Sequence, residues 1–316
     1  MANSKTVMIA LGGNALSPKS EAGTITEQFR HTKSSLKGVM HFVRANYNIC
    51  ITHGNGPQVG AELSRNEIAA EKIPPLPLGV LVANTQGAMG YMIQQSLQNA
   101  LYSEDSNREV VSFISQMKVN GNDPAIGNPS KFIGVSYTND KARKYMSKYG
   151  WEMKEQEPGL WRRVVPSPDP LYIFNGKSIK HLVDFGTIVI AGGGGGIPAY
   201  NLEDGSLEGL DGVIDKDMTA ALLGRIIKAQ ELFIITDVDN IYLNFKTDSQ
   251  EIIRNTTAKD VEQWLKDGQF WRGTMEPKIK AALYFLNHHG KEVIITSIKN
   301  IEKSIQKKAG TRILKN

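Results

Sequence analysis

The sequence predicts an α/β fold built around a mainly parallel sheet, and two observations carry this prediction. Short apolar segments recur along the 316 residues, and the apolar residues within each segment are continuous rather than alternating. Continuous apolarity is typical of strands covered on both faces. Segments with helical periodicity lie between them, and repeated strand–helix–strand units form a doubly wound parallel sheet. Ligands of such sheets bind beyond the carboxyl ends of the strands.

The apolar segments themselves are the predicted strands. They are TVMIA (6–10), NICIT (48–52), VVSFIS (110–115), TIVIA (187–191), LFIIT (232–236) and EVIIT (292–296). Two helices are predicted between or beside them. One begins near Thr26, and the other is the segment MEPKIKAALYFLNHHG, which ends before Gly290. The residues that share one face of the first helix are Phe29, Leu36, Val39, Met40 and Val43.

The charge of the chain excludes few functions. Its 37 Lys and Arg residues against 32 Asp and Glu residues give a net charge of +5, but both signs are scattered. A small anionic substrate explains the surplus as well as nucleic acid would, and we expect no nucleic-acid partner because no aromatic and basic docking motif is present. The densest basic segment, KNIEKSIQKKAGTRILKN, spaces Ile301 and Ile305 as in a terminal helix with a solvated face.

We expect a soluble cytoplasmic protein without a membrane partner. No apolar run approaches the roughly 20 residues of a membrane span, and the N-terminus lacks the apolar core and cleavage site of a secretory signal. The single cysteine, Cys50, can form no internal disulfide, which suits a reducing compartment. Within NICIT, Cys50 is expected to be part of the core.

Residues 117–172 break the strand–helix rhythm. They contain NGNDPAIGNPSKFIG, a charged helix-like segment and GLWRRVVPSPDP, and they are rich in Pro and Gly. This composition favours an inserted subdomain over another strand–helix unit, with a long decorated loop as the alternative. Arg162 and Arg163 are interpreted as partners of carboxylates within the same subdomain.

Three glycine-rich turns follow three of the predicted strands. They are LGGNAL, HGNGPQVG and AGGGGGIP, and the first two lead into predicted helices. Glycine lets the backbone approach a ligand closely, and the unpaired N–H groups of a helix N-terminus attract anions. Each turn taken alone is also compatible with a plain strand–helix connection. The run of five glycines is costly to order, which favours close contact with a ligand.

The familiar phosphate and metal motifs are absent from the sequence. GKS has Leu171 where a P-loop requires glycine, and GGGGGIP fails G-x-G-x-x-G because Ile197 or Pro198 takes the last glycine position. No Cys and His spacing of a metal site occurs. The adjacent His288 and His289 are expected to close a helix.

Three lysines are candidates for chemistry. In GVIDKDMTAALL, Lys216 lies between Asp215 and Asp217 at the start of a predicted helix, where the positive helix end disfavours a lysine. This misfit indicates that Lys216 serves a ligand. Lys278 lies in the first turn of the last predicted helix, and Lys131 follows NPS in the inserted segment. Each lysine taken alone is also compatible with an ordinary surface position.

The segment ITDVDNIYLNF follows an apolar strand and contains Asp237, Asp239 and Tyr242. The simpler interpretation is a strand followed by an Asx-type turn. The functional interpretation is one wall of a nucleotide pocket.

Taken together, these motifs resemble the carbamate kinases of the amino-acid-kinase superfamily. In chain order they are ALGGNAL, HGNGPQVG, NPSKFIG, WRRVVPSPDP, GGGGGIP, VIDKD, TDVDNIYLNF and MEPKIKAA. The resemblance spans nearly the whole chain, from Ala10 to the final GTRI. The motifs most specific to that family are NDPAIGNPSKFIG and WRRVVPSPDP.

The resemblance implies an open αβα sandwich that forms a homodimer. Residues 1–185 would be the substrate-side half, with a protruding subdomain at about 117–172, and residues 186–316 the nucleotide-side half. It implies reversible phosphoryl transfer between ADP or ATP and carbamoyl phosphate or carbamate, which usually makes ATP in fermentative arginine breakdown. Mg²⁺ would be carried by the phosphates of ATP or ADP, without metal ligands from the protein.

The resemblance implies four catalytic residues, Lys131, Lys216, Asp217 and Lys278. The lysines would supply positive charge, and Asp217 would hold lysines in place. Carbamate is already an anion, so transfer through a loose transition state needs positioning and charge neutralisation rather than a general base. The missing His, Cys or Ser dyad is therefore expected.

The binding residues that the resemblance implies come from the glycine turns and from the segment with Asp237. Those around carbamate and the transferring phosphoryl group are Gly12, Gly13, Asn14, Gly54 and Asn55. Those on the nucleotide side are Gly194, Gly195, Asp237, Tyr242 and Lys278.

Two positions depart from the pattern of the family. Glu276 stands where glycine is common before the proline of the last motif, and it bears on where Lys278 lies. Gly79 stands where aspartate is common. We expect neither to abolish activity. The alternatives are another phosphotransferase of the superfamily, acting on an amino-acid carboxylate or a nucleoside monophosphate, and a non-catalytic nucleotide-binding regulator.

Overall fold

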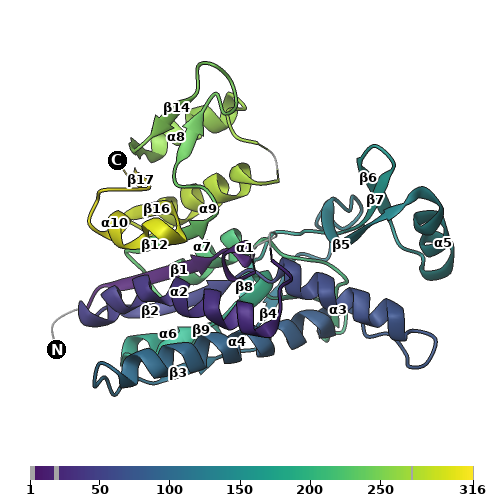
Figure 1. Ribbon diagram of the computed structural model, residues 1–316, viewed down its shortest axis with the longest axis horizontal. Coiled ribbons are helices and arrows are strands. Elements are labelled where there is room, and N and C mark those ends of the chain that lie inside the picture. Colours follow the sequence, from purple (N-terminus) through teal and green to yellow (C-terminus); the bar gives the residue numbers. More distant parts are fainter. Residues whose placement is uncertain (1–3, 18–20, 272, 316) are drawn as a thin grey trace.

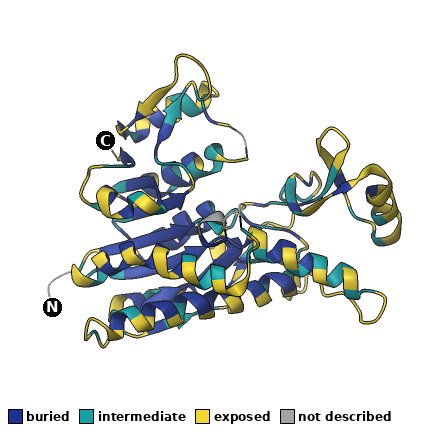
Figure 2. Cartoon of the chain, in the orientation of Figure 1, coloured by how far each residue is buried: buried dark blue, intermediate teal, exposed yellow. Residues whose placement is uncertain are grey.

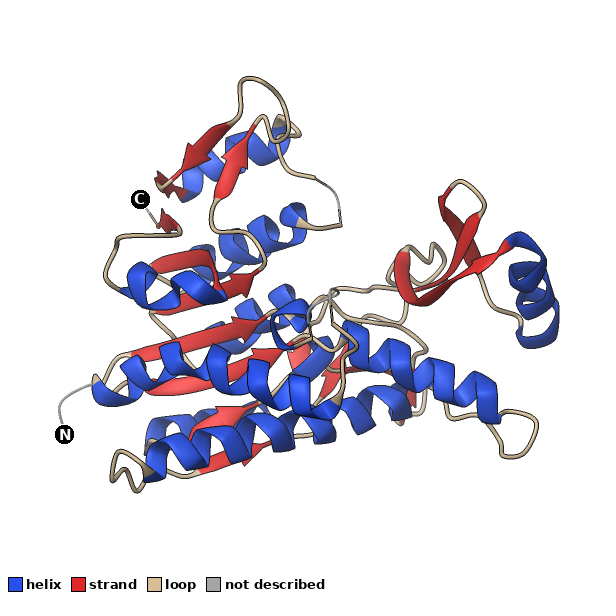
Figure 3. Ribbon diagram, in the orientation of Figure 1, coloured by secondary structure: helices blue, strands red, loops and turns tan. Residues whose placement is uncertain are grey.

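The computed structural model describes residues 4–17, 21–271 and 273–315, and an eight-stranded sheet forms its centre (Figures 1 and 3). Its strands are β1 (Thr6–Leu11), β2 (Asn48–His53), β3 (Val110–Ser112), β9 (Ile188–Ile190), β12 (Glu231–Thr236), β15 (Asn255–Thr257), β16 (Glu292–Ser297) and β17 (Thr311–Leu314). They follow the order β15-β17-β16-β12-β1-β2-β9-β3. Neighbouring strands are parallel except for β16 and β17.

This sheet confirms the predicted fold class and contains all the predicted strands. The third is shorter than expected, because its pairing with β9 ends at Ser112. The prediction was wrong for the end of the basic C-terminal segment. Its first part forms the short helix α10 (Ile301–Ile305), but Thr311–Leu314 is a strand of the sheet. Arg312 fits there because its guanidinium forms an ion pair with Glu292 of β16.

Helices cover both faces of the sheet, so the molecule has the layers of an αβα sandwich. The first face is covered by α2 (Ile25–Arg44), α4 (Leu78–Tyr102) and α10. The second face is covered by α6 (Gly176–Phe185), α7 (Lys216–Ile226), α8 (Ala258–Lys266) and α9 (Met275–His288). Central strand β1 serves both cores, since Val7, Ile9 and Leu11 pack on the first face and Met8 and Ala10 on the second.

The two helices predicted from periodicity are α2 and α9. Thr24 begins α2 through a capping box in which its N–H donates to Glu27 Oε2 at 2.7 Å. Leu36, Val39 and Met40 are buried on the expected face of α2. Helix α9 ends at His288, and His289 follows as its cap, as predicted.

Smaller elements gather at the carboxyl ends of the strands. Helix α1 (Gly13–Leu16) follows β1, helix α3 (Gly56–Ala69) follows β2, and the 3-10 turn η1 (Gly193–Gly195) follows β9. A second sheet has the order β11-β10-β4-β8. Its strands are β4 (Gln116–Lys118), β8 (Tyr172–Ile173), β10 (Ile197–Asn201) and β11 (Leu207–Gly209). A separate hairpin pairs β13 (Ile241–Leu243) with β14 (Glu251–Ile253).

A small subdomain projects from this region of the molecule (Figure 1). It contains β5 (Lys131–Thr138), α5 (Asn139–Tyr149), β6 (Met153–Glu157) and β7 (Leu160–Val165), with strand order β5-β7-β6. Its surface is largely exposed, as Figure 2 shows, and its small core consists of Tyr137, Ala142 and Met153 with neighbouring aromatic rings. Strands β4 and β8, at the two ends of 117–172, pair with each other, so the projecting part is shorter than the whole segment. The division of the chain into two halves stays a prediction.

Cys50 lies in the core, as predicted, within β2. Burial raises the pKa of its thiol to about 12, so this thiol stays protonated at neutral pH. Across residues 4–17, 21–271 and 273–315, none of the helices combines the length and the apolar character that crossing a membrane requires.

Candidate active site

The first two glycine turns meet at the carboxyl ends of β1 and β2. The Gly12 N–H donates to the Ile235 carbonyl at 2.9 Å, and the Gly54 N–H donates to the Leu11 carbonyl at 2.8 Å. A Cβ on Gly54 would lie 2.8 Å from the backbone nitrogen of Gly13. Both bonded N–H groups are therefore used within the protein. The N–H groups that can face a ligand here are those in the first turns of α1 and α3.

The side chain of Asn55 lies between the second glycine turn and α4. Its Nδ2 donates to Thr85 Oγ1 at 2.8 Å, and Thr85 Oγ1 donates to the Val82 carbonyl at 2.8 Å. These two bonds fix the orientation of the amide. The backbone of Asn14 belongs to α1, but its side chain lies outside the part of the chain that the structure describes.

Contacts within the protein explain the five-glycine turn. The φ angles are positive from 194 to 196, a region that strains other residues. A Cβ on Gly194 would lie 2.2 Å from Nδ2 of Asn55, and a Cβ on Gly195 would lie 2.1 Å from the carbonyl oxygen of Ile214. The turn requires glycine for these reasons alone. The glycine run is therefore not independent evidence of contact with a ligand.

One buried carboxylate holds two lysines at this edge of the sheet. Asp217, in the first turn of α7, is 2% exposed. One of its oxygens accepts a hydrogen bond from the ammonium of Lys216. The other accepts a hydrogen bond from the ammonium of Lys278, in α9, at 3.0 Å. Cδ of Lys216 would lie 3.2 Å from a Cβ on Gly54, so this lysine lies against the second glycine turn. The structure thus brings together three of the predicted catalytic residues.

The carboxylate and the ammonium groups of this cluster stabilise one another in their charged forms. Burial alone would raise the pKa of Asp217, but the ammonium groups of Lys216 and Lys278 hold the pKa below its usual range. Burial opposes the charge of Lys278, yet the carboxylate of Asp217 raises the pKa of this lysine. The cluster therefore carries one negative and two positive charges at neutral pH. A net positive charge faces the glycine turns.

Lys131 reaches the same region from the projecting subdomain. It is the first residue of β5, and its ammonium donates to Asp215 Oδ2 at 3.1 Å. Asp215 caps α7 and directly precedes Lys216 in the chain. The three lysines predicted to be catalytic therefore meet around the N-terminus of α7, although they come from three separate parts of the fold.

A cavity of about 420 Å³ opens beside Lys278. Asp237 and Tyr242, the residues predicted to flank the nucleotide, both line it. Phe245 and Trp271 add aromatic wall, with ring centroids 5.4 Å apart. Aromatic walls of this kind suit a flat heteroaromatic base. The cavity therefore combines aromatic walls with the ammonium of Lys278.

The arginines of the inserted segment do not form the predicted pairs. The Nε of Arg162 donates to the carbonyl oxygens of Ile133 and Gly134, at 3.3 and 2.9 Å, because the irregular pairing of β5 leaves both carbonyls accessible. Arg163 pairs with Asp211 at 3.4 Å, and Asp211 lies outside residues 117–172. Arg163 therefore joins the subdomain to the body of the molecule.

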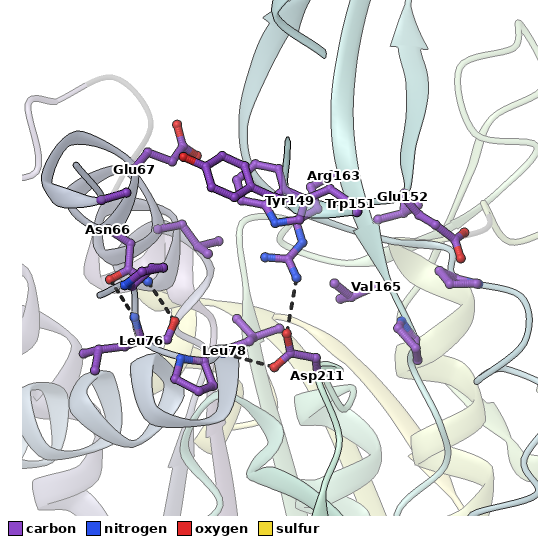
Figure 4. A pocket seen from close by; sticks show the side chains of 18 of the residues that line it. Asn66, Glu67, Leu76, Leu78, Tyr149, Trp151, Glu152, Arg163, Val165 and Asp211 are labelled. Carbon is purple, nitrogen blue, oxygen red and sulfur yellow. Dashed lines mark hydrogen bonds and ion pairs between the residues drawn. The ribbon is translucent and has the colours of Figure 1, made fainter. Parts of the chain in front are cut away.

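Figure 4 shows this joint, which borders a second cavity of about 600 Å³. Asp211 also accepts the N–H of Leu78 at 3.1 Å, at the start of α4. The guanidinium of Arg163 lies over the ring of Trp151, 4.7 Å from its centroid. None of the predicted site residues whose side chains the structure describes lines this cavity, so it belongs to the attachment of the subdomain rather than to the site at α7.

The carboxylates near the site are engaged with cations and N–H groups. Within the described residues, no group of three or more His, Cys, Asp or Glu side chains could hold a metal ion. Asp217 binds two lysines, and Asp215 binds Lys131 and the first turn of α7. Two further acidic candidates lie nearby: Asp239 pairs with Lys299 at 3.1 Å, and Asp237 accepts a hydrogen bond from the hydroxyl of Thr236 at 3.1 Å. Asp215 and Asp217 are therefore already paired within the protein.

The two departures from the family's pattern are accommodated locally. Glu276 forms an ion pair with Lys280 at 2.7 Å, and Lys278 forms its ion pair with Asp217 instead. Gly79 lies in the first turn of α4, where a Cβ would be 3.3 Å from Cγ2 of Ile197.

Three residues of the site were missed by sequence reasoning, namely Asp215 as a lysine partner and Phe245 and Trp271 as cavity walls. A signal for Asp215 was present, since aspartate directly before a helix is a favoured cap. The signal for the two rings was weak. They lie in separate loops, and only the folded chain brings Trp271 to Phe245.

Comparisons with known proteins agree on the family. A model of the amino acid kinase family matches residues 5–297. The carbamate kinase of Pyrococcus horikoshii is 39% identical, over 97% of this chain and 98% of that protein. The carbamate kinase of Staphylococcus epidermidis is 39% identical, over 98% and 99%. The structure of carbamate kinase from Giardia lamblia bound to AMP-PNP is 36% identical, has a TM-score of 0.92 and covers 99% of both chains. The chain therefore belongs to the amino acid kinase family, and within that family to the carbamate kinases.

Proposed function

We propose that this protein catalyses reversible phosphoryl transfer between carbamoyl phosphate or carbamate and ADP or ATP. One observation carries the proposal: Lys131, Lys216 and Lys278 converge between the glycine turns and the aromatic cavity. The similar proteins of Pyrococcus and Staphylococcus are carbamate kinases, and the similar Giardia structure is bound to a nucleotide analogue. Both findings support the same reaction.

The reaction requires positive charge and positioning rather than a base. In the ATP-forming direction, an oxygen of ADP bonds to phosphorus while the bond from phosphorus to the carbamate oxygen breaks. The transition state is loose, with charge on three equatorial oxygens. The ammonium groups of Lys131, Lys216 and Lys278 neutralise that charge. Asp217 fixes two of them before substrate arrives, so little reorganisation is left for the reaction itself.

Each substrate has its own side of the site in this proposal. The first turns of α1 and α3, with Gly13 and Asn55, hold the carbamoyl group through backbone N–H groups. The nucleotide occupies the cavity lined by Asp237 and Tyr242. Mg²⁺ carried on the nucleotide phosphates would supply further positive charge to the transferring group.

The test is formation of ATP from ADP and carbamoyl phosphate by the purified protein, followed with luciferase. We expect ATP to form, and we expect Lys216→Ala to lower kcat by about 10²-fold or more, by analogy with the loss of one donor to a developing anion. The reason is that Lys216 is the lysine in contact with the second glycine turn.

Lys266→Ala is the matched control. Lys266 is an exposed lysine of α8 that pairs with Glu262 on the same helix, so its loss should leave kcat unchanged. Urea unfolding curves of both variants test whether each variant is folded. A folded Lys216→Ala variant with normal turnover would contradict the role of Lys216, and no ATP from the parent protein would contradict the function.

We also propose that the protein acts in the cytoplasm as a homodimer. The free, protonated thiol of Cys50 suits a reducing compartment. Exposed apolar side chains on α2 and α4 support self-association.

A further inference from the structure

The segment Asp211–Asp215, which links β11 to α7, is one of the places where the projecting subdomain is attached to the body. At its start, Asp211 pairs with Arg163 of β7 at 3.4 Å. In its middle, the Val213 N–H donates to the Pro166 carbonyl at 2.9 Å. At its end, Asp215 pairs with Lys131 of β5. Both ends of the subdomain are thus tied to one short segment.

The two carboxylate oxygens of Asp215 have different partners. Oδ1 accepts the backbone N–H groups of Asp217, at 2.9 Å, and Met218, at 3.4 Å, which caps α7. Oδ2 accepts the ammonium of Lys131 at 3.1 Å. One residue therefore joins the helix that carries Lys216 to the lysine that comes from the subdomain.

We propose that Asp215 is a positioning residue for phosphoryl transfer, which fixes the ammonium of Lys131 relative to Lys216. The inference rests on the proposed function. A lysine side chain has several rotatable bonds, and Lys131 is half-buried, so without a partner its ammonium turns towards water. Misplacement of a charge by about 1 Å is enough to slow a reaction by up to about 10²-fold.

An alternative function for Asp215 is helix capping alone. Asparagine distinguishes the two, because it is as good a cap as aspartate but carries no charge for Lys131. If Asp215 only caps α7, Asp215→Asn leaves catalysis intact. If Asp215 positions Lys131, the variant loses activity although the helix remains capped.

The experiment measures ATP formation from ADP and carbamoyl phosphate by Asp215→Asn. We expect kcat to fall by about tenfold or more, with the KM for ADP and the Tm unchanged, since the ion pair is partly open to solvent and contributes little stability. Wild-type kcat in this variant would overturn the proposal.

Asp211→Asn is the matched control, because it makes the same substitution four residues earlier on the same segment. It removes the ion pair with Arg163 but keeps an oxygen for the N–H of Leu78. We expect its kcat to stay within about twofold of the parent value, the scatter expected for a surface charge. An equal loss of kcat in both variants would mean that the segment acts only by attaching the subdomain, and would overturn the proposal.

A double-mutant cycle with Lys131→Met isolates the pair. If Asp215 acts through Lys131, adding Asp215→Asn to Lys131→Met lowers kcat no further. If the double variant instead loses kcat by the product of the two single fold-losses, the two residues act independently and the inference is overturned. Full activity of Lys131→Met would also overturn it.

A readout that does not depend on activity separates this inference from the proposed function. Lysine labelling with acetic anhydride, read by mass spectrometry, should rise at Lys131 in Asp215→Asn and not in Asp211→Asn. If the parent protein makes no ATP, the proposed function fails, and unchanged labelling of Lys131 in Asp215→Asn overturns the positioning role by itself.

Discussion

His53 is the last residue of β2, and its ring is buried beneath the five-glycine turn. The side chain is 1% exposed, and a Cβ on Gly193 would lie 2.4 Å from its Nε2. Burial lowers the pKa of His53 from 6.5 to about 4, and the nearby charge of Lys216 acts in the same direction. The ring is therefore neutral in the folded protein at neutral pH.

We expect the free energy of unfolding to fall as the pH drops from 6.5 towards 4. In this window the unfolded chain protonates His53 while the folded protein does not, so protons favour the unfolded state. The full effect is about 3 kcal/mol. Urea unfolding at about pH 7.5 and about pH 5 should show about 2 kcal/mol of this effect, because the rest develops only as the pH falls to 4 and below. In His53→Gln the free energy of unfolding should lose this part of its dependence on pH. If the dependence on pH stays the same, another group is responsible.

The role of a single residue could be predicted where its side chain is unfavourable for the local secondary structure. Lys216 was found because a lysine is unfavourable at a helix N-terminus, and the structure places it against Asp217. The pairing of Lys131 with Asp215 was not predictable, because 84 residues separate them and no periodicity relates them. For the same reason, Arg163 was expected to pair with carboxylates of its own segment, whereas it pairs with Asp211 outside that segment.

Among the elements, the five-glycine turn carries the sharpest prediction. We expect Gly194→Ala to lower both stability and kcat, because φ is +65° and the new Cβ would displace the amide of Asn55. The strain costs about 1–3 kcal/mol before any clash is counted. Urea unfolding and the ATP assay measure the two effects.

Gly205→Ala provides the comparison. Gly205 also has a positive φ, of +84°, but a Cβ there meets nothing within 4 Å. It should lose only about 1–2 kcal/mol of stability and keep its kcat. If Gly194→Ala behaved in the same way, contact with Asn55 would not be what the turn requires.

The central strands were predictable because burial on both faces leaves continuous apolar runs in the sequence. Strand β17 was not. It is short, it follows several lysines, and it contains Arg312, whose charge is balanced by Glu292 on the neighbouring strand. Thr311 adds a second contact across the fold, since its Oγ1 accepts the N–H of Ile241 at 2.8 Å. Tertiary partners of this kind leave no local pattern.

For the whole molecule, the layered architecture followed from the sequence, but the attachment of the subdomain did not. Composition marked residues 117–172 as unusual, and the structure shows that only the part from β5 to β7 projects (Figure 1). The ends of the segment pair as β4 and β8. Composition cannot distinguish these cases, because pairing between distant ends depends on the rest of the fold.

We expect a homodimer with twice the 34.8 kDa mass of the chain, measured by sedimentation equilibrium. Ile25 of α2 and Tyr91 of α4 are each 58% exposed, and Tyr91 packs edge-on against Phe29. Such neighbouring apolar side chains favour an interface. The double variant Ile25→Glu/Tyr91→Lys should therefore be monomeric. Tyr102→Lys, at the far end of α4, is the control, and a dimeric double variant would exclude this face.

The sharing of carboxylates among the lysines has a consequence for how quickly products leave. Three ammonium groups face two carboxylates at the N-terminus of α7, so their combined charge is one unit rather than three. Three unpaired ammonium groups would bind the anionic products, ATP and carbamate, more tightly and would slow their release. Pairing with Asp215 and Asp217 lowers this attraction, and we therefore expect it to favour release of the product anions.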